Sequence, residues 1–365
     1  MKKRLDSIQA LRALAFMGIF LFHGGIIWGN FGGLGASVFI VLSGFLMTYS
    51  YSDRILPNSF DGCVGFALKK IKRLYPLHIL TMVIILIGLV FLAAKNNEIT
   101  YDYIKQMCIW TVSNIFLVQS YIPVISINVS LNGVAWYLCV CVFLYFCFPF
   151  VMKIIEKYKS IKTAYIVIPI LYLIQILISF LTVNIKGFDG NFHTWITYCC
   201  PFFRLLDFSI GCNLGYIFLE NSKKSINNKN DDEEKVSIIY SIFELLAFVI
   251  APFLVWWSQG QYSSRLANTF TPTTIIFLPL SVALVYLFAK KKGIFTRCLS
   301  IKSILRLGDL SQYMFLIHFA VIFVVSKIVS FLSLGLNKYI IALIYFLLTY
   351  ICAVLYEKFD KRLNK

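Results

Sequence analysis

Charged side chains are scarce in this sequence. Of its 365 residues, 14% are charged, whereas 59% are hydrophobic. Soluble domains carry about 25% charged and roughly 45–50% apolar residues. A soluble fold of this length could not bury so much apolar surface, so the composition excludes an ordinary soluble protein. It indicates that lipid is the solvent, and the 34 Phe and 21 Tyr residues suit lipid-facing and interfacial positions.

The sequence also lacks the residue spacing of a metal centre. Its ten cysteines are scattered, no CxxC pair occurs, and only four histidines are present. Most of the cysteines lie inside apolar runs, where packing between helices is their ordinary role. We therefore expect no metal site and no permanently bound cofactor.

Long apolar runs follow one another along the chain, without an internal repeat. A membrane-spanning helix needs about 20 mostly apolar residues. The runs that meet this requirement are 8–28, 33–52, 74–94, 133–155, 163–183, 201–219, 236–257, 273–290, 311–331 and 336–356. The sequence predicts an all-α, polytopic membrane bundle of about ten transmembrane helices. We expect a single membrane domain over 1–365, with a polar cytoplasmic linker near 220–235 and no appended soluble domain.

The positions of the basic residues predict the orientation of these spans. If the N-terminus is cytoplasmic, the segments on that side hold 26 of the 34 Lys and Arg residues, and the outer loops hold five. This asymmetry is the one that cytoplasmic loops show. It places both termini in the cytoplasm. It also explains most of the net charge of +17 without a nucleic-acid partner.

Two ionisable residues, Arg12 and His23, lie within the first predicted span, where each is a functional hypothesis by default. They are eleven residues apart, so both point the same way and stand about 16 Å apart along the helix. An Arg binds phosphate through paired hydrogen bonds, and a His transfers protons near neutral pH. The structural alternative is an Arg that reaches the inner interface and a His that is bonded to a backbone carbonyl.

Other predicted spans carry polar residues on one face. In the sixth span, Arg204 and Asp207 are three residues apart and could form a structural ion pair or a site. In the ninth, Ser311 and His318 are seven residues apart. A basic amphipathic segment, 58–73, precedes the third span and could bind either anionic lipid or a phosphate ligand.

Five segments, in order along the chain, resemble the integral membrane acyltransferase 3 family, which O-acylates sugars and polysaccharides. The first has Arg12 and His23 in the family's Arg-x10-His spacing, and the last ends in His318. The others contain the run FIVLSGF, a basic stretch and a weaker RxxDFxxG match. The segments are 5–23, 39–45, 70–76, 201–211 and 307–318.

The resemblance implies a chemistry and a set of roles. The donor would be an acyl-CoA, most of all acetyl-CoA, and the acceptor a hydroxyl of a sugar or polysaccharide, in a bacterial cytoplasmic membrane. His23 would act as general base. The residues that would hold the donor are Arg12, Ser43, Lys70 and Arg73. The further candidates are His318 and Asp207 for catalysis, and Trp136, Tyr137, Arg204 and Tyr313 for the acceptor.

The sequence departs from the family pattern in its fourth predicted span. Cys141 stands where many members carry a Glu, so Asp207 is the candidate if a catalytic carboxylate is needed. Smaller departures are Ser37 in the second motif and Lys70 in the third.

Three other functions share the many helices and the intramembrane charges. The first is a transporter or flippase of a lipid-linked glycan or acyl group, although no inverted repeat is apparent. The second is a glycan polymerase, for which a large outer loop with several Arg residues would be expected. The third is an inactive scaffold. Binding of acyl-CoA would distinguish the enzyme from all three.

Overall fold

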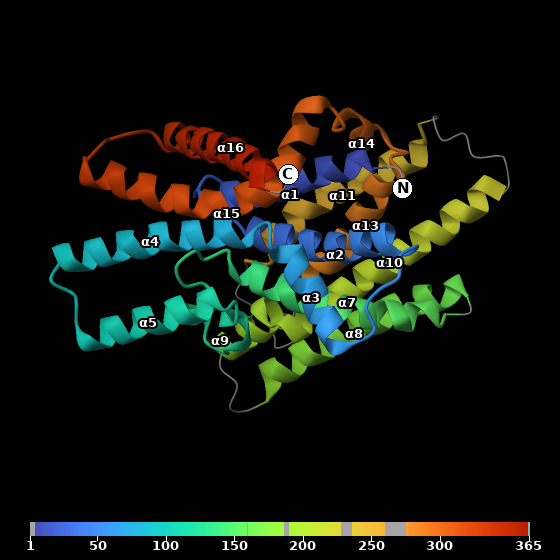
Figure 1. The fold of residues 1–365 in the computed structure, drawn as a ribbon. Helices are drawn as coiled ribbons and strands as arrows, with labels where there is room; N and C mark the ends of the chain where they lie inside the picture. The colour runs from blue at the N-terminus through green and yellow to red at the C-terminus, as the bar shows by residue number, and fades with distance from the viewer. Residues whose placement is uncertain (1–3, 159, 186–189, 228–235, 260–274, 364–365) are drawn as a thin grey trace.

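The computed structural model describes residues 4–158, 160–185, 190–227, 236–259 and 275–363. These residues form helices and connecting turns without a strand (Figure 1). Within these described residues, eight segments are long and apolar enough to cross a membrane. They are α2 (Phe31–Tyr51), α4 (Tyr75–Lys95), α7 (Trp136–Glu156), α8 (Ile161–Asn184), the segment Gly190–Lys224, α11 (Ile238–Trp257), α15 (Lys302–Phe331) and α16 (Lys338–Leu363). The chain is an integral membrane protein with the expected helical fold.

The other two expected spans are also helical, but shorter. Span 8–28 corresponds to α1 (Asp6–His23), and span 273–290 to η3 (Ile275–Phe277) and α13 (Leu278–Lys290), its first two residues lying outside the described ranges. Helix α1 ends five residues earlier than predicted because a glycine-rich reversal follows it. Gly25 and Gly29 have φ angles of +67° and +103°, which glycine adopts without strain. His23 is therefore the last residue of its helix.

The remaining elements complete the connections between the spans. They are α3 (Phe60–Ile71), α5 (Tyr101–Ile115), η1 (Gln119–Tyr121), α6 (Ile125–Asn128) and α14 (Ile294–Cys298). The segment Gly190–Lys224 consists of α9 (Gly190–Thr194), η2 (Trp195–Cys199) and most of α10 (Pro201–Asn227). Residues 220–227, the first part of the expected linker, continue helix α10, and 228–235 lie outside the described ranges.

Glycines allow close packing at the two main helix contacts. Between α2 and α10, a Cβ added at Gly44 would collide with the backbone of Phe208, and one at Gly211 with that of Val41. Between α1 and α15, a Cβ at Gly308 would collide with the backbone of Gln9. Small residues at such positions let helix backbones approach closely in membranes. Helix α2 is therefore held close to α10, and α1 close to α15, around the region described below.

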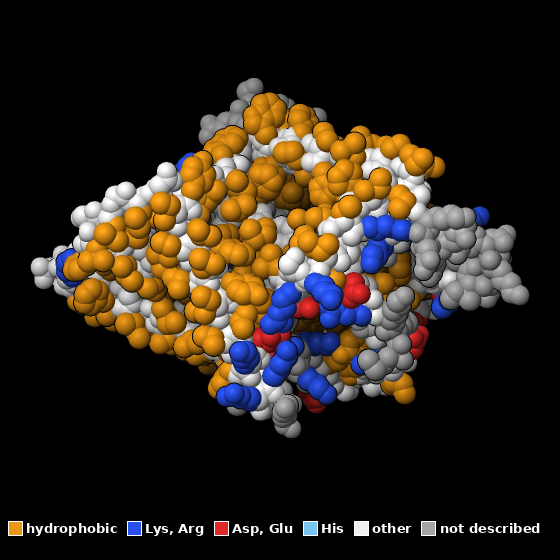
Figure 2. All heavy atoms as spheres, turned by 90° about the horizontal axis from the view of Figure 1, so that it is seen from above, with side chains coloured by type: hydrophobic (Ala, Val, Ile, Leu, Met, Phe, Trp, Pro, Cys, Tyr) orange, Lys and Arg blue, Asp and Glu red, His pale blue; other side chains and the backbone are white. Residues whose placement is uncertain are grey.

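Hydrophobic side chains cover most of the face drawn in Figure 2, as expected for a surface against lipid. Lys and Arg gather with a few acidic residues in one part of that face. Ion pairs connect the first turns of α15 to neighbouring segments. Arg306 binds Glu357 of α16 through contacts of 2.9 and 2.6 Å, and Arg4, which precedes α1, binds Asp309 at 2.6 Å.

We expect Gly308→Ala to destabilise the protein by roughly 1–3 kcal/mol, because the added methyl group forces α1 and α15 further apart. Unfolding of the purified protein in detergent measures this change. Gly65→Ala is the matched control: a Cβ there meets open space on the exposed side of α3, so stability should stay the same or rise slightly. An equal loss in both variants would contradict the packing role of Gly308.

Candidate active site

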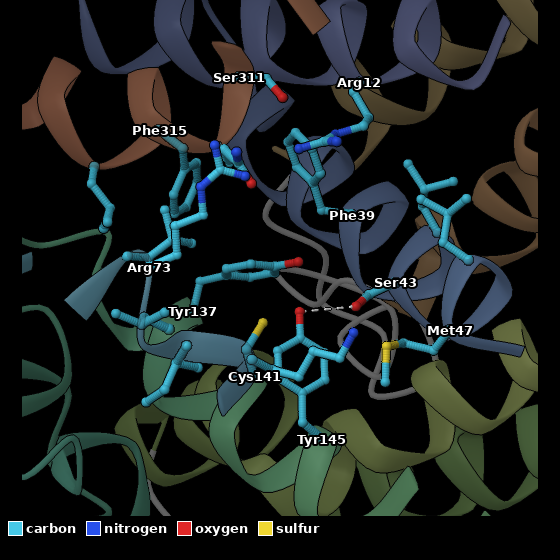
Figure 3. A pocket seen from close by; sticks show the side chains of 18 of the residues that line it. Arg12, Phe39, Ser43, Met47, Arg73, Tyr137, Cys141, Tyr145, Ser311 and Phe315 are labelled. Atoms are coloured by element: carbon cyan, nitrogen blue, oxygen red, sulfur yellow. Dashed lines mark hydrogen bonds between the residues drawn. The ribbon is translucent and has the colours of Figure 1, made fainter. Parts of the chain in front are cut away.

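A pocket of about 340 Å³ opens between α1, α2, α3, α7 and α15 (Figure 3). Helix α2 supplies one complete wall of it. The wall residues recur every three or four positions, so they form a stripe along one face of α2. The opposite face of α2 carries Gly44, which packs against α10. The wall consists of Phe39, Leu42, Ser43, Leu46, Met47, Ser50 and Tyr51.

Three cations line this pocket: Arg12 from α1, Lys70 from α3 and Arg73 from the turn after α3. No carboxylate is among the described lining residues. The Lys70 ammonium lies 4.2 Å from the centre of the Tyr51 ring, and Arg73 forms an ion pair with Asp360. The lining therefore suits an anionic ligand. The structure brings together the four residues expected to hold the donor, since Ser43 lines the same pocket.

Polar groups of α7 complete the lining, and sequence reasoning had singled out only some of them. The Ser43 hydroxyl lies 3.5 Å from the Tyr145 hydroxyl, and both face the pocket in Figure 3. Cys141 lies beside Tyr145 in the lining. Tyr137, expected to contact an acceptor, lines this same pocket. Tyr137, Cys141 and Tyr145 are spaced by four residues, which puts all three on one face of α7. This spacing is the feature of the sequence that indicates a shared lining.

His23 and His318, separated by 295 positions in the sequence, are in direct contact. Nδ1 of His23 lies 2.9 Å from Nε2 of His318, and the rings are stacked with an angle of 13° between their planes. His318 is completely buried, whereas His23 is half-buried. Phenylalanine rings surround the pair, with Phe16 and Phe315 against His318 and Phe319 against His23.

The hydrogen bonds of this pair fix the tautomers of both neutral rings. Nδ1 of His318 lies 3.1 Å from the carbonyl oxygen of Met314, which can only accept, so this nitrogen carries the proton. Nε2 of His318 is then an acceptor, and it receives the proton on Nδ1 of His23. Nε2 of His23 is left with its lone pair. This nitrogen is therefore a base that is oriented by a second histidine.

The structure places two expected site residues elsewhere. Arg204 and Asp207 are 0% and 1% exposed and do not line the pocket. Their side chains are joined at 2.5 Å, and Gln175 donates to Asp207 at 2.8 Å. Arg204 also donates to the carbonyl oxygens of Thr197 and Tyr198. These internal partners are those of a buried structural ion pair.

Trp136 and Tyr313 also lie outside the pocket lining. Trp136 is 4% exposed and packs on Tyr198, with 4.7 Å between the ring centres. Tyr313 is 1% exposed and donates to Asp360 at 2.8 Å. Asp360 in turn binds Arg73, so Tyr313 supports a pocket cation from behind. Among the described residues, no cluster of His, Cys, Asp or Glu has the arrangement of a metal site.

Comparison with known proteins gives matches to acyltransferases. A family model of the acyltransferase 3 type, described as an acyltransferase domain, matches residues 5–358. The O-acetyltransferase OatA of Staphylococcus aureus is 24% identical over 332 residues, which are 88% of this chain and 51% of that protein. The chain thus spans about half the length of this curated relative.

Two shorter matches have related names. The peptidoglycan O-acetyltransferase OatA of Listeria monocytogenes is 31% identical over 90 residues, 25% of this chain and 14% of that protein. The acyltransferase MdmB of Streptomyces mycarofaciens is 26% identical over 172 residues, 42% of this chain and 41% of that protein. No solved structure matches the chain.

Asp207→Ala should leave Arg204 as an unpaired buried charge and cost about 3–5 kcal/mol of stability. The double variant Arg204→Met with Asp207→Leu removes both charges and should recover most of the loss. Size-exclusion profiles and thermal unfolding in detergent measure both effects. A double variant that is as stable as wild type but has lost activity per folded molecule would show that the pair belongs to the site.

Proposed function

Because the chain belongs to the acyltransferase 3 family, we propose that it is a membrane O-acyltransferase that moves an acetyl group from acetyl-CoA to a sugar hydroxyl. One observation carries this proposal. A pocket lined by three cations leads towards a histidine whose Nε2 is free to act as a base.

The cations support an acyl-CoA donor. The nucleotide part of CoA carries several phosphate charges, and Arg and Lys are the side chains that bind phosphate best. The basic asymmetry of the loops puts Lys70 and Arg73 towards the cytoplasm, where acyl-CoA is available. In this proposal Lys70 and Arg73 hold the phosphates. Arg12 and Ser43 contact the ligand deeper in the pocket.

His23 supplies the proton transfer that the reaction needs. Its Nε2 removes the proton of the acceptor hydroxyl as the hydroxyl oxygen attacks the thioester carbonyl carbon. The tetrahedral intermediate then collapses, the bond from carbon to sulfur breaks, and the departing CoA sulfur takes the proton from His23. His318 contacts His23 rather than the reacting atoms. It therefore acts as a positioning residue that keeps the lone pair on Nε2.

The acceptor is a glycan that approaches from the side opposite the basic pocket. His23 ends its helix on that side, and it is half-buried rather than enclosed. The name of the Listeria relative makes peptidoglycan the first acceptor to test.

His23→Ala should abolish acetyl transfer, a loss of about 10²-fold or more, and leave acetyl-CoA binding unchanged. Radiolabelled acetyl-CoA is given to wild type and variant in nanodiscs with extracted cell-envelope glycans. Label recovered in the glycan measures transfer, and equilibrium dialysis measures binding. Normal transfer by the variant would overturn the role of His23. A wild type that neither binds acetyl-CoA nor labels a glycan would favour the transporter or scaffold alternatives.

Lys70→Ala and Arg12→Ala should each weaken acetyl-CoA binding by about tenfold or more, because each removes a charged partner of the ligand. Lys72→Ala is the matched control. Lys72 is two residues further along the chain, equally charged and exposed, but it does not line the pocket, so its loss should change the dissociation constant by less than about twofold. Equal effects of the Lys70 and Lys72 substitutions would mean that only overall charge matters.

A further inference from the structure

Three aromatic rings of the pocket lining pack against one another. They are Phe39 of α2, Tyr137 of α7 and Phe315 of α15. The ring centres of Tyr137 and Phe315 are 5.3 Å apart, those of Phe39 and Phe315 are 6.2 Å apart, and those of Phe39 and Tyr137 are 6.3 Å apart. Each ring therefore packs edge-on against the other two. Figure 3 shows the three rings converging from different ribbons.

One ring of this triangle, Phe315, connects the cationic pocket to the histidine pair. Phe315 is on the pocket side, and its ring centre is 6.0 Å from that of His318. His318 follows Phe315 by three residues, about 4.5 Å further along the same helix. Neither His23 nor His318 lines the pocket. Phe315 therefore stands between the pocket and His318, the partner of His23.

The backbone around the triangle is held in place. The buried Asn132 side chain donates to the carbonyl oxygen of Leu316 at 3.0 Å and to the Thr81 hydroxyl at 2.8 Å. These bonds connect α15 to α4 at the residue after Phe315. The face of α2 opposite Phe39 is fixed by its close packing against α10. A passage between the rings would thus open by rotation of the side chains while these helices stay in place.

We propose that Phe39, Tyr137 and Phe315 form a gate that limits the size of the transferred acyl group, with Phe315 as its principal residue. The proposal rests on the proposed function, since it assumes an acyl-CoA in the cationic pocket. A two-carbon acyl group passes when the rings rotate. A longer chain cannot be accommodated among three rings in mutual contact, and so acetyl-CoA is selected over longer acyl-CoA molecules.

The experiment compares acetyl-, butyryl- and hexanoyl-CoA with wild type, Phe315→Ala and Phe346→Ala. Phe346 is the matched control, because it is a half-buried ring that packs on Phe20 outside the pocket. One extra methylene in a closed apolar site changes kcat/KM by about tenfold or more. Wild type and Phe346→Ala should therefore prefer acetyl-CoA strongly. Phe315→Ala should raise the ratio of butyryl to acetyl transfer by at least about tenfold.

A second readout separates the gate from the proposed function. Competition binding with the same CoA series should show affinity falling with acyl length in wild type but not in Phe315→Ala. Length-dependent binding without transfer to any glycan would overturn the proposed function and leave the gate in place. Binding and transfer that do not depend on acyl length in wild type would overturn the gate. A ratio of butyryl to acetyl transfer that is the same in folded Phe315→Ala as in wild type would also overturn the gate.

Discussion

The close approach of α1 to α15 is the constraint on which the candidate site depends. At Gly308 the two backbones meet so closely that no side chain fits between them. The two helices run in the same direction from this contact. Further along them, His23 at the end of α1 meets His318 of α15. The bond between the two rings requires that neither helix shift by more than a fraction of an ångström. A residue without a side chain therefore controls the orientation of the base.

Helix α2 shows how one short sequence run can serve two purposes. The run FIVLSGF places Phe39 and Ser43 on the face that lines the pocket, and Gly44 on the face that meets α10. Because the glycine fixes the distance of α2 from α10, the pocket wall cannot collapse or widen. The other wall, on α7, consists of residues four positions apart, which share one face of that helix. Packing on one side of each helix thus determines the shape of the cavity on the other.

The sequence predicts much of the fold because the membrane imposes it. Apolar runs of sufficient length have to be helices in lipid, and five of the described spans (α2, α4, α7, α8 and α11) agree with the expected ones to within three residues. By contrast, α15 begins nine residues before its expected span, and α10 and α16 end eight and seven residues after theirs, because the helices continue into polar sequence that hydropathy does not count. The end of α1 was missed because the apolar run continues past His23, whereas the glycines after it reverse the chain. Helical spacing also grouped Arg12 with His23 correctly on one helix. It could not show that the first lines a pocket and the second does not.

Contacts between distant segments were beyond sequence reasoning. Periodicity says which residues share a face, but not what that face meets. Hence Arg204 and Asp207 could be either an ion pair or a site, and the buried partners of both side chains now favour the ion pair. The same limit applies to His318. Its place on one face with Ser311 was clear, whereas its contact with His23 depends on how α1 and α15 pack.

The partner of His23 has a chemical consequence. In many catalytic sites a carboxylate orients the histidine and stabilises the imidazolium that forms. Here a neutral, buried histidine does the orienting, and no carboxylate is hydrogen-bonded to either ring in the described part of the chain. Such a partner fixes geometry but adds no negative charge. In the proposed reaction a thioester donor suits this arrangement, because the departing CoA thiolate would have a conjugate acid with a pKa of roughly 8.5 and would take the proton back at once. The imidazolium of His23 then need persist only for the lifetime of the tetrahedral intermediate.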